Sequence, residues 1–155
     1  MIRRGYYCHY KGKVFACGFK DDIVLLRSND VEDLKKRGFI NNIYFQDTKD
    51  KFSNVWNTKY SKNVSIKKIK WFCSISTIGY YRGYEVGIAS ESEDEYIIGK
   101  NCVPADSEVF SEENGFERID RFFVSGKVPK SEVTNITEIK KPINKKYKAP
   151  DNWDF

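Results

Sequence analysis

The second half of the chain repeats the first, and this repeat limits the folds open to it more than any other feature. Four segments of the first half recur in the second: residues 10–15 as 81–86, residues 21–26 as 93–98, residues 37–40 as 114–117, and residues 64–69 as 133–139. The offsets of 71, 72, 77 and 69 residues keep the order while short insertions shift the register. A duplicated unit with variable loops gives this pattern.

Short β-favouring runs separated by turn residues recur through both halves, with strand spacing rather than helix spacing. The predicted strands cover residues 6–10, 14–19, 23–27, 43–46, 64–69, 71–75, 78–81, 84–89, 95–99, 122–125 and 133–139. Gly12 and Gly83 each stand where a tight hairpin needs a positive φ. Residues 46–62 are polar and predict a long loop.

One short helix is expected in each half. Residues 29–37 have a capping Asn or Asp, acids in the first turn, bases in the last turn and Gly38 just beyond. Residues 105–115 are similar but acidic at their C-terminal end, which predicts a weaker helix.

The fold class that follows is mainly β: two tandem small antiparallel β units, SH3-like or half-barrel, each with one short helix and packed together. The expected domains are residues 1–75 (first repeat, basic), 76–139 (second repeat, acidic) and 140–155 (Lys-rich C-terminal arm). A single larger antiparallel sheet made by both copies is the alternative architecture.

The cysteines and the N-terminus indicate a reducing cytosol, of the bacterial type or in general. Cys8, Cys17, Cys73 and Cys102 lack both the paired spacing of a zinc site and the density of a secreted miniprotein. We find no apolar stretch long enough for a signal peptide or a membrane span. A Cys8–Cys17 disulfide is disfavoured, because a hairpin centred on Gly12 places Cys8 opposite Ala16.

The sequence argues against an enzyme. His9 is the only histidine, and its neighbour Cys8 points to the opposite face of a strand. The chain has no phosphate-binding glycine loop, nucleophile elbow or calcium loop. We therefore expect no catalytic residues, no metal site and no cofactor.

The two copies differ in net charge. Residues 1–75 carry 16 Lys+Arg and 7 Asp+Glu, a net charge of +9, whereas residues 76–155 carry 11 and 15, a net charge of −4. Without the Lys-rich tail from residue 140 onward, the second copy has 6 basic and 13 acidic residues, a net charge of −7. Two copies of one scaffold with opposite fields can attract different partners or each other.

Acidic residues interleaved with aromatic residues in the second copy form the predicted partner-binding site. Such a surface suits a basic protein, because charge sets the encounter rate and buried aromatic rings lengthen the residence time. The site residues are Glu91, Glu93, Asp94, Glu95, Tyr96, Glu112, Glu113, Glu117 and Asp120. For Phe39 and Phe116, which recur in both copies, we favour a place in the core.

The layout resembles that of immunity proteins of bacterial polymorphic toxin and contact-dependent growth inhibition systems. The resemblance rests on the Tyr-Lys-Gly-Lys hairpin of residues 10–13, the Gly-Phe steps at 38–39 and 115–116, and the Lys-Ser-Glu-Val segment of residues 130–133. It implies a cytoplasmic protein that binds and neutralises its cognate toxin domain, often a basic nuclease. That family has no common catalytic or ligand motif, so no residue role is carried over.

Nucleic acid is the alternative partner. Residues 59–62 and 67–72, with the Lys-rich tail, mix lysines with aromatic residues that suit phosphates and unpaired bases. The negative second copy would repel nucleic acid over half of the molecule. A solvated basic face, or docking onto the acidic copy, accounts for the same lysines.

Overall fold

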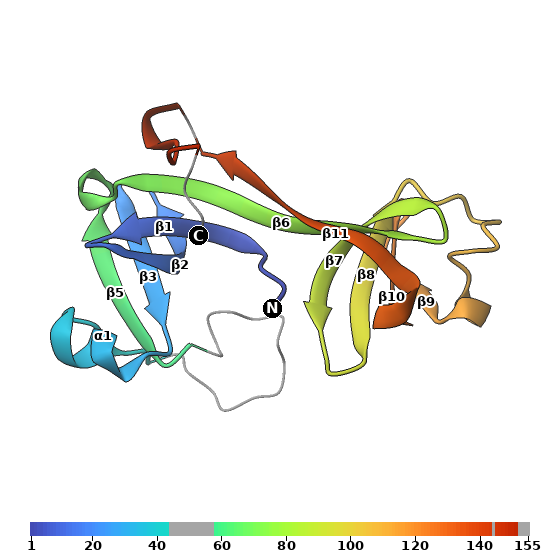
Figure 1. The fold of residues 1–155 in the computed structure, drawn as a ribbon, viewed down its shortest axis with the longest axis horizontal. Coiled ribbons are helices and arrows are strands. Elements are labelled where there is room, and N and C mark those ends of the chain that lie inside the picture. Colours follow the sequence, from blue (N-terminus) through green and yellow to red (C-terminus); the bar gives the residue numbers. More distant parts are fainter. Residues whose placement is uncertain (44–57, 144, 152–155) are drawn as a thin grey trace. The chain divides into compact units, whose positions relative to one another are not determined.

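The computed structural model describes residues 1–43, 58–143 and 145–151, and their backbone is mainly β (Figure 1). Their strands are β1 (Gly5–Tyr10), β2 (Lys13–Lys20), β3 (Ile23–Ser28), β4 (Ile40–Asn41), β5 (Tyr60–Ser65), β6 (Trp71–Tyr81), β7 (Tyr84–Glu91), β8 (Glu95–Asn101), β9 (Phe116–Arg118), β10 (Phe123–Pro129) and β11 (Val133–Pro142). The same residues contain the helix α1 (Val31–Lys36) and the 3-10 turns η1 (Ile66–Lys68), η2 (Glu112–Asn114), η3 (Lys130–Glu132) and η4 (Lys145–Tyr147). The strand pairs with a described register are antiparallel. The expected mainly β class is confirmed.

The same succession of elements occurs twice, and β6 takes part in both. The first series runs β1, β2, β3, α1, β4, β5, η1 and β6, and the second runs β6, β7, β8, η2, β9, β10, η3 and β11. The hydrogen-bonded order is β4-β5-β3-β2-β1-β6 in the first series and β9-β10-β8-β7-β6-β11 in the second. In each series the first strand lies between the second and the last, and all eleven described strands belong to one sheet, as in the alternative of a single antiparallel sheet made by both copies. The internal repeat of the sequence thus corresponds to a repeated strand order.

The chain divides into two compact units that exchange their end segments. Residues Gly5–Ser74 with Lys140–Phe155 form one unit, and Met1–Arg4 with Ile75–Ile139 form the other. The first contains 19 Lys+Arg and 9 Asp+Glu, a net charge of +10, and we call it the basic unit. The second contains 8 and 13, a net charge of −5, and we call it the acidic unit. The exchange increases the charge contrast between the units.

Matching two-residue turns open the two series. Lys11 and Gly12 have φ values of 47° and 81°, and Arg82 and Gly83 have values of 47° and 82°. The flanking residues pair as Tyr10 with Lys13 and Tyr81 with Tyr84. Two successive positive φ angles define a type I′ hairpin, which matches the right-handed twist of the strands.

This turn corrects the expected register of the cysteines in the first hairpin. Cys8 lies opposite Phe15 rather than Ala16, because the turn consists of Lys11 and Gly12 instead of being centred on Gly12. Cys8 and Cys17 are both buried and free. A hydrogen bond with Cys8, together with burial, raises the pKa of the Cys17 thiol. The pair thus behaves as small buried side chains.

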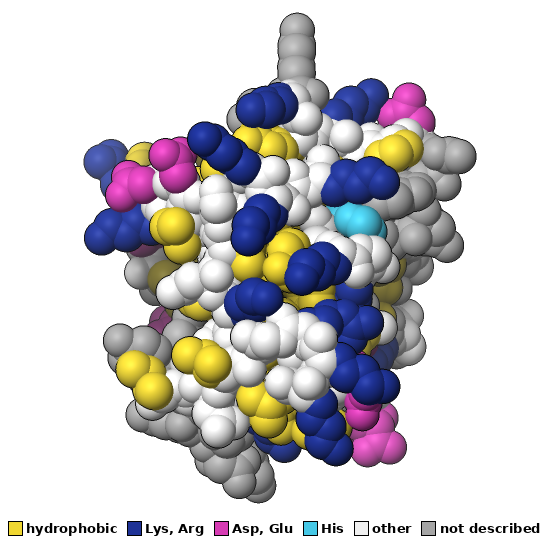
Figure 2. Space-filling view, turned by 90° about the vertical axis from the view of Figure 1, so that its left-hand side faces the viewer, with side chains coloured by type: hydrophobic (Ala, Val, Ile, Leu, Met, Phe, Trp, Pro, Cys, Tyr) yellow, Lys and Arg dark blue, Asp and Glu magenta, His cyan; other side chains and the backbone are white. Residues whose placement is uncertain are grey.

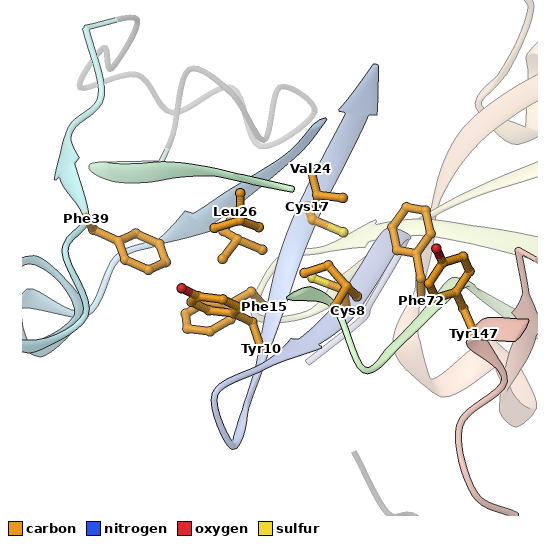
Figure 3. Close-up of a cluster of buried hydrophobic side chains, with 11 residues drawn as sticks. Cys8, Tyr10, Phe15, Cys17, Val24, Leu26, Phe39, Phe72 and Tyr147 are labelled. Carbon is orange, nitrogen blue, oxygen red and sulfur yellow. The ribbon is translucent and has the colours of Figure 1, made fainter. Parts of the chain in front are cut away.

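Each unit has its own hydrophobic core, built at equivalent positions. In the basic unit Tyr10, Leu26 and Phe39 pack with the other labelled side chains of Figure 3. Tyr81, Ile98 and Phe116 occupy the corresponding places in the acidic unit. Phe39 and Phe116 are each 3% exposed, which confirms their assignment to the core.

The end segments complete these cores. Ile2 packs against the core of the acidic unit, and the Arg3 backbone oxygen there accepts a hydrogen bond from Thr77 Oγ1 at 2.9 Å. Tyr147 is buried in the core of the basic unit, where the Ile143 amide also donates to the Phe72 oxygen at 3.1 Å. The described part of the tail beyond residue 140 is therefore packed, whereas the sequence predicted an extended arm.

The strands predicted over residues 71–75 and 78–81 form the single strand β6, and residues 44–46 of the strand predicted over 43–46 lie outside the described part. Three further predicted elements differ from the structure. The strand predicted over residues 64–69 ends at Ser65, because the Ser65 hydroxyl accepts from the Lys67 amide at 3.3 Å and begins η1. The helix expected within 105–115 is reduced to η2, where Asn114 Nδ2 donates to the Glu108 oxygen and the C-terminal acids oppose the helix dipole. In the predicted loop 46–62, β5 begins at Tyr60, and residues 46–57 lie outside the described part.

The fully buried carboxylate of Asp33 fixes α1 to the sheet of the basic unit. Its Oδ2 accepts from Lys13 Nζ at 2.7 Å and from the Ser28 hydroxyl, and its Oδ1 accepts from Arg37 Nη1 at 2.9 Å. Asp30 caps the helix by accepting from the Glu32 amide at 2.9 Å. A buried carboxylate with these partners joins β2, β3 and α1.

We expect the substitution Asp33→Ala to lower the free energy of unfolding by about 1–3 kcal/mol, because it removes a buried acceptor of three hydrogen bonds and leaves their donors without it. The control Glu32→Ala removes an exposed acid paired with Lys36, and should cost about 0.5 kcal/mol. Urea denaturation followed by far-ultraviolet circular dichroism measures both. Equal losses for the two variants would contradict the role given to Asp33.

Candidate functional site

The candidate site lies where a strand turn meets the last 3-10 turn of each series. In the acidic unit the Lys130 amide donates to the Asp94 oxygen at 2.9 Å, and in the basic unit the Ile66 amide donates to the Asp22 oxygen at 2.8 Å. We call residues 91–95 with Lys130–Glu132 the acidic junction, and residues 19–23 with Ile66–Lys68 the basic junction. The two junctions share one backbone arrangement.

This equivalence corrects one segment of the repeat. Because η1 and η3 are equivalent, residues 64–69 correspond to 128–133 rather than to 133–139. Val64 and Val128 are then both buried, as are Ile69 and Val133. The offset is 64 residues, since the connection between β4 and β5 is longer than that between β9 and β10.

Three carboxylates of the acidic junction face solvent. Glu93, Asp94 and Glu95 are all exposed, and within the described residues no lysine, arginine or histidine forms an ion pair with them. The Ser92 amide donates to the Glu95 oxygen at 2.9 Å, and the Glu95 amide donates to the Ser92 hydroxyl at 3.2 Å. These bonds hold the charges on a defined turn.

Glu91 differs from these residues because it is bonded within the unit. Lys130 Nζ donates to its Oε2 at 3.0 Å, and the Ile2 amide donates to its Oε1 at 3.0 Å. The hydrogen bond from Lys130 is the main cause that holds the pKa of Glu91 below its ordinary value. Tyr96 lies beside this group, half-buried against the core, with Lys130 Nζ 5.2 Å from its ring centre. Glu91 and Tyr96 thus hold the parts of the acidic junction together through their contacts with Lys130.

The other predicted site residues form a second group. Glu112 and Glu113 lie in η2, and Glu117 lies on β9 opposite Ser125. Glu95 pairs with Pro129, so Glu95 and Glu117 are four residue steps apart on β10, about 13 Å along the strand. Asp120 accepts from the amides of Phe122 and Phe123 at 2.7 and 2.9 Å, which closes the turn before β10.

Sequence reasoning missed Glu132, an exposed acid of η3 in the acidic junction. It also missed the basic junction, where Lys20, Lys67 and Lys68 are exposed. An offset of 64 residues between the last parts of the repeat would have identified both sets. The signal was present in the Ile and Val positions that flank the two 3-10 turns.

Outside the two junctions, the described residues include His9 and a hollow in the acidic unit. No group of three or more His, Cys, Asp or Glu residues in the described part is placed to hold a metal ion. His9 lies 5.9 Å from the Trp71 ring, and burial, with a smaller effect of Lys70, lowers its pKa. A hollow of about 420 Å³ in the acidic unit is lined by Tyr84, Lys100, Cys102 and others, with no histidine among them. None of the described helices is both long and apolar enough to cross a membrane.

Comparison with known proteins identifies a family. A family model described as Uncharacterised conserved protein UCP033725 matches residues 2–145. No curated protein and no solved structure matches the chain. The matched residues include both junctions.

We expect the substitution Glu91→Gln to destabilise the protein at neutral pH, and the loss to shrink on acidification. A carboxyl group with a lowered folded-state pKa stabilises the fold above its unfolded pKa, about 4.3, and loses that contribution as the pH falls through the folded value. Urea denaturation between pH 7 and pH 3 measures the difference. The control Glu93→Gln, at an exposed unpaired acid, should leave the profile unchanged. A loss for Glu91→Gln that stays constant with pH would contradict the assignment.

Proposed function

This chain belongs to the family Uncharacterised conserved protein UCP033725, and we propose that it is an immunity protein that binds and neutralises a basic toxin domain. The partner contacts the acidic junction, and the toxin is a nuclease whose cationic substrate-binding surface the junction covers. The function is one of protein–protein contact in the bacterial cytoplasm, without catalysis and without a cofactor.

The observation that carries the proposal is the exposure of Glu93, Asp94 and Glu95 on a hydrogen-bonded turn. Glu91 at the start of the same turn is bonded to Lys130 instead. Three neighbouring carboxylates without such partners in the described residues leave their field directed at solvent. A cationic partner gains most from that arrangement.

The surrounding charge strengthens this field. The acidic unit has a net charge of −5, and Glu132 adds a further exposed carboxylate to the junction. Complementary charge raises association rates up to about 10⁸–10⁹ M⁻¹s⁻¹ at low salt. Rapid capture suits a protein that must neutralise a toxin before it acts.

The resemblance to immunity proteins supports the choice of partner class. It covers the hairpin at residues 10–13 and the segment at 130–133, which the structure places in β1–β2 and in η3. The Lys-Ser-Glu part of that segment thus belongs to the acidic junction itself.

A co-expression experiment tests the proposal. A toxin-like C-terminal domain encoded by a neighbouring gene is sought and expressed in a bacterium, alone and with the protein, and absence of any such neighbouring gene would contradict the proposal. We expect growth arrest by the domain alone, rescue by the wild-type protein, and loss of rescue for Glu93→Lys, Asp94→Lys and Glu95→Lys combined. Purified components should show association at least tenfold slower for the triple variant and less dependent on salt.

A matched triple variant separates the junction from net charge. Glu85→Lys, Asp106→Lys and Glu108→Lys reverse three exposed acids of the same unit outside the junction. This control should retain rescue and most of the association rate. Rescue by the junction variant, or equal loss in the control, would overturn the proposal. A third variant, Glu112→Lys with Glu113→Lys and Glu117→Lys, tests whether the second acidic group contributes.

A further inference from the structure

The basic junction presents a charge opposite to that of its counterpart on the same backbone arrangement. Lys20, Lys67 and Lys68 are exposed, and within the described residues no carboxylate forms an ion pair with them. The hydrogen bond from the Ile66 amide to the Asp22 oxygen holds η1 against the β2–β3 turn, so these lysines belong to one end of the unit. Asp21 and Asp22 are exposed at the same turn and partly offset the lysines.

Two exposed aromatic rings lie on strands of the same unit, one of them within the basic junction. Phe19 precedes Lys20 and is 46% exposed, and Tyr6 on β1 is 41% exposed. Their ring centres are 5.1 Å apart in an edge-to-face arrangement. Both rings rest on the fully buried Phe72, with centre distances of 5.1 Å for Phe19 and 5.9 Å for Tyr6. The buried ring supports the exposed pair from below.

Comparison of the two junctions shows that this aromatic platform is particular to the basic unit. Phe19 pairs with Val24 next to the turn, and the residue in the same place of the acidic unit is Glu91, which pairs with Tyr96. The core does not require Phe19, because the equivalent position accepts a hydrophilic side chain. An exposed phenylalanine there lowers the solubility of the protein. Exposed apolar surface of this kind marks a binding site.

Figure 2 shows the side-chain types on one face of the molecule, the side on which β1 to β5 are drawn in Figure 1. On the face drawn, Lys and Arg side chains are spread between patches of hydrophobic side chains, and acidic side chains are few. The basic unit carries a net charge of +10. Its surface therefore combines positive potential with exposed apolar rings.

We propose that the basic junction, with the platform of Tyr6 and Phe19, binds single-stranded nucleic acid. The lysines contact phosphates, while the two rings stack on unpaired bases, which present a flat face whatever their sequence. The site differs from the one anticipated from the sequence, since Trp71 and Phe72 are buried and cannot stack on a ligand. The carboxylates of an acidic protein would pair with the lysines. They would not provide flat groups on which the two rings could stack.

This activity is independent of the toxin-binding function, because it uses residues of the basic unit alone. The carboxylates of the acidic junction take no part in it. A protein of this kind would hold an RNA or DNA strand at one unit and a cationic protein at the other. If the test of toxin binding fails, the test of nucleic-acid binding can still be interpreted, and the reverse also holds.

Fluorescence anisotropy with a labelled oligouridine of about 15 nucleotides tests the proposal on the full-length protein. We expect binding at low salt that weakens steeply as salt is added. Tyr6→Leu with Phe19→Leu, which keeps apolar bulk on Phe72 but removes the flat rings, should weaken binding by about tenfold or more. Lys67→Ala with Lys68→Ala should weaken it and make the log–log salt slope shallower by about 1.4.

Control variants and a control ligand distinguish nucleic-acid binding at the basic junction from general attraction between opposite charges. Lys35→Ala with Lys36→Ala removes the same charge from α1, at the other end of β3, and should change the affinity less than twofold. Polyglutamate of similar length should bind at least tenfold more weakly than oligouridine. Unchanged thermal denaturation shows that each variant is folded. The proposal is overturned by absence of oligouridine binding at low salt, by tighter binding of polyglutamate, by no effect of the leucine pair, or by equal loss in the α1 control.

Discussion

Strand β6 imposes the main constraint on this fold, because it completes one series of strands and begins the next. From Cys73 to Tyr81 every second residue of β6 is buried, while Phe72 enters the core of the basic unit. Side chains alternate between the two faces of a strand, so a slip of one residue would expose this whole set. The register of each series is thereby tied to that of the other. The exchanged end segments add to this, since Ile2 and Tyr147 each pack into a core formed mainly by the opposite half of the chain.

Within that constraint the two series have kept their backbone and changed their charge. The amides of Ile66 and Lys130 make the same hydrogen bond to the preceding turn, yet the residues around the first bond carry a small positive net charge and those around the second a negative one. Backbone hydrogen bonds depend little on exposed side chains, so surface charge can diverge while the core stays fixed. The aromatic platform follows the same logic, because Phe19 occupies a place where Glu91 is equally compatible with the strand pair. Function in this chain is a property of exposed positions on a repeated scaffold.

Sequence reasoning succeeded where a local signal was strong. Gly12 and Gly83 marked the two hairpins, and the polar and charged residues around Asp30 marked α1, because turn and cap chemistry acts over a few residues. It failed where contacts distant in sequence decide the outcome. The run of residues 64–69 has the composition of a strand, but η1 interrupts it to satisfy the Asp22 oxygen. Among the aromatic residues, composition could not show that Trp71 is buried and Tyr6 exposed, since both stand in alternating β patterns.

The sequence alone determined that the chain is duplicated, mainly β and unevenly charged, because repeats, alternation and net charge are properties of residue order and composition. Only the tertiary structure decided which charged side chains form ion pairs. Glu91 is bonded to Lys130, 39 positions away, while its neighbours Glu93 and Glu95 stay in solvent, although nothing in their order distinguishes them. Likewise the packing of Tyr147 into the first core increased the charge contrast between the units. Burial and ion pairing arise from long-range packing, and a one-dimensional pattern does not contain the distances on which they depend.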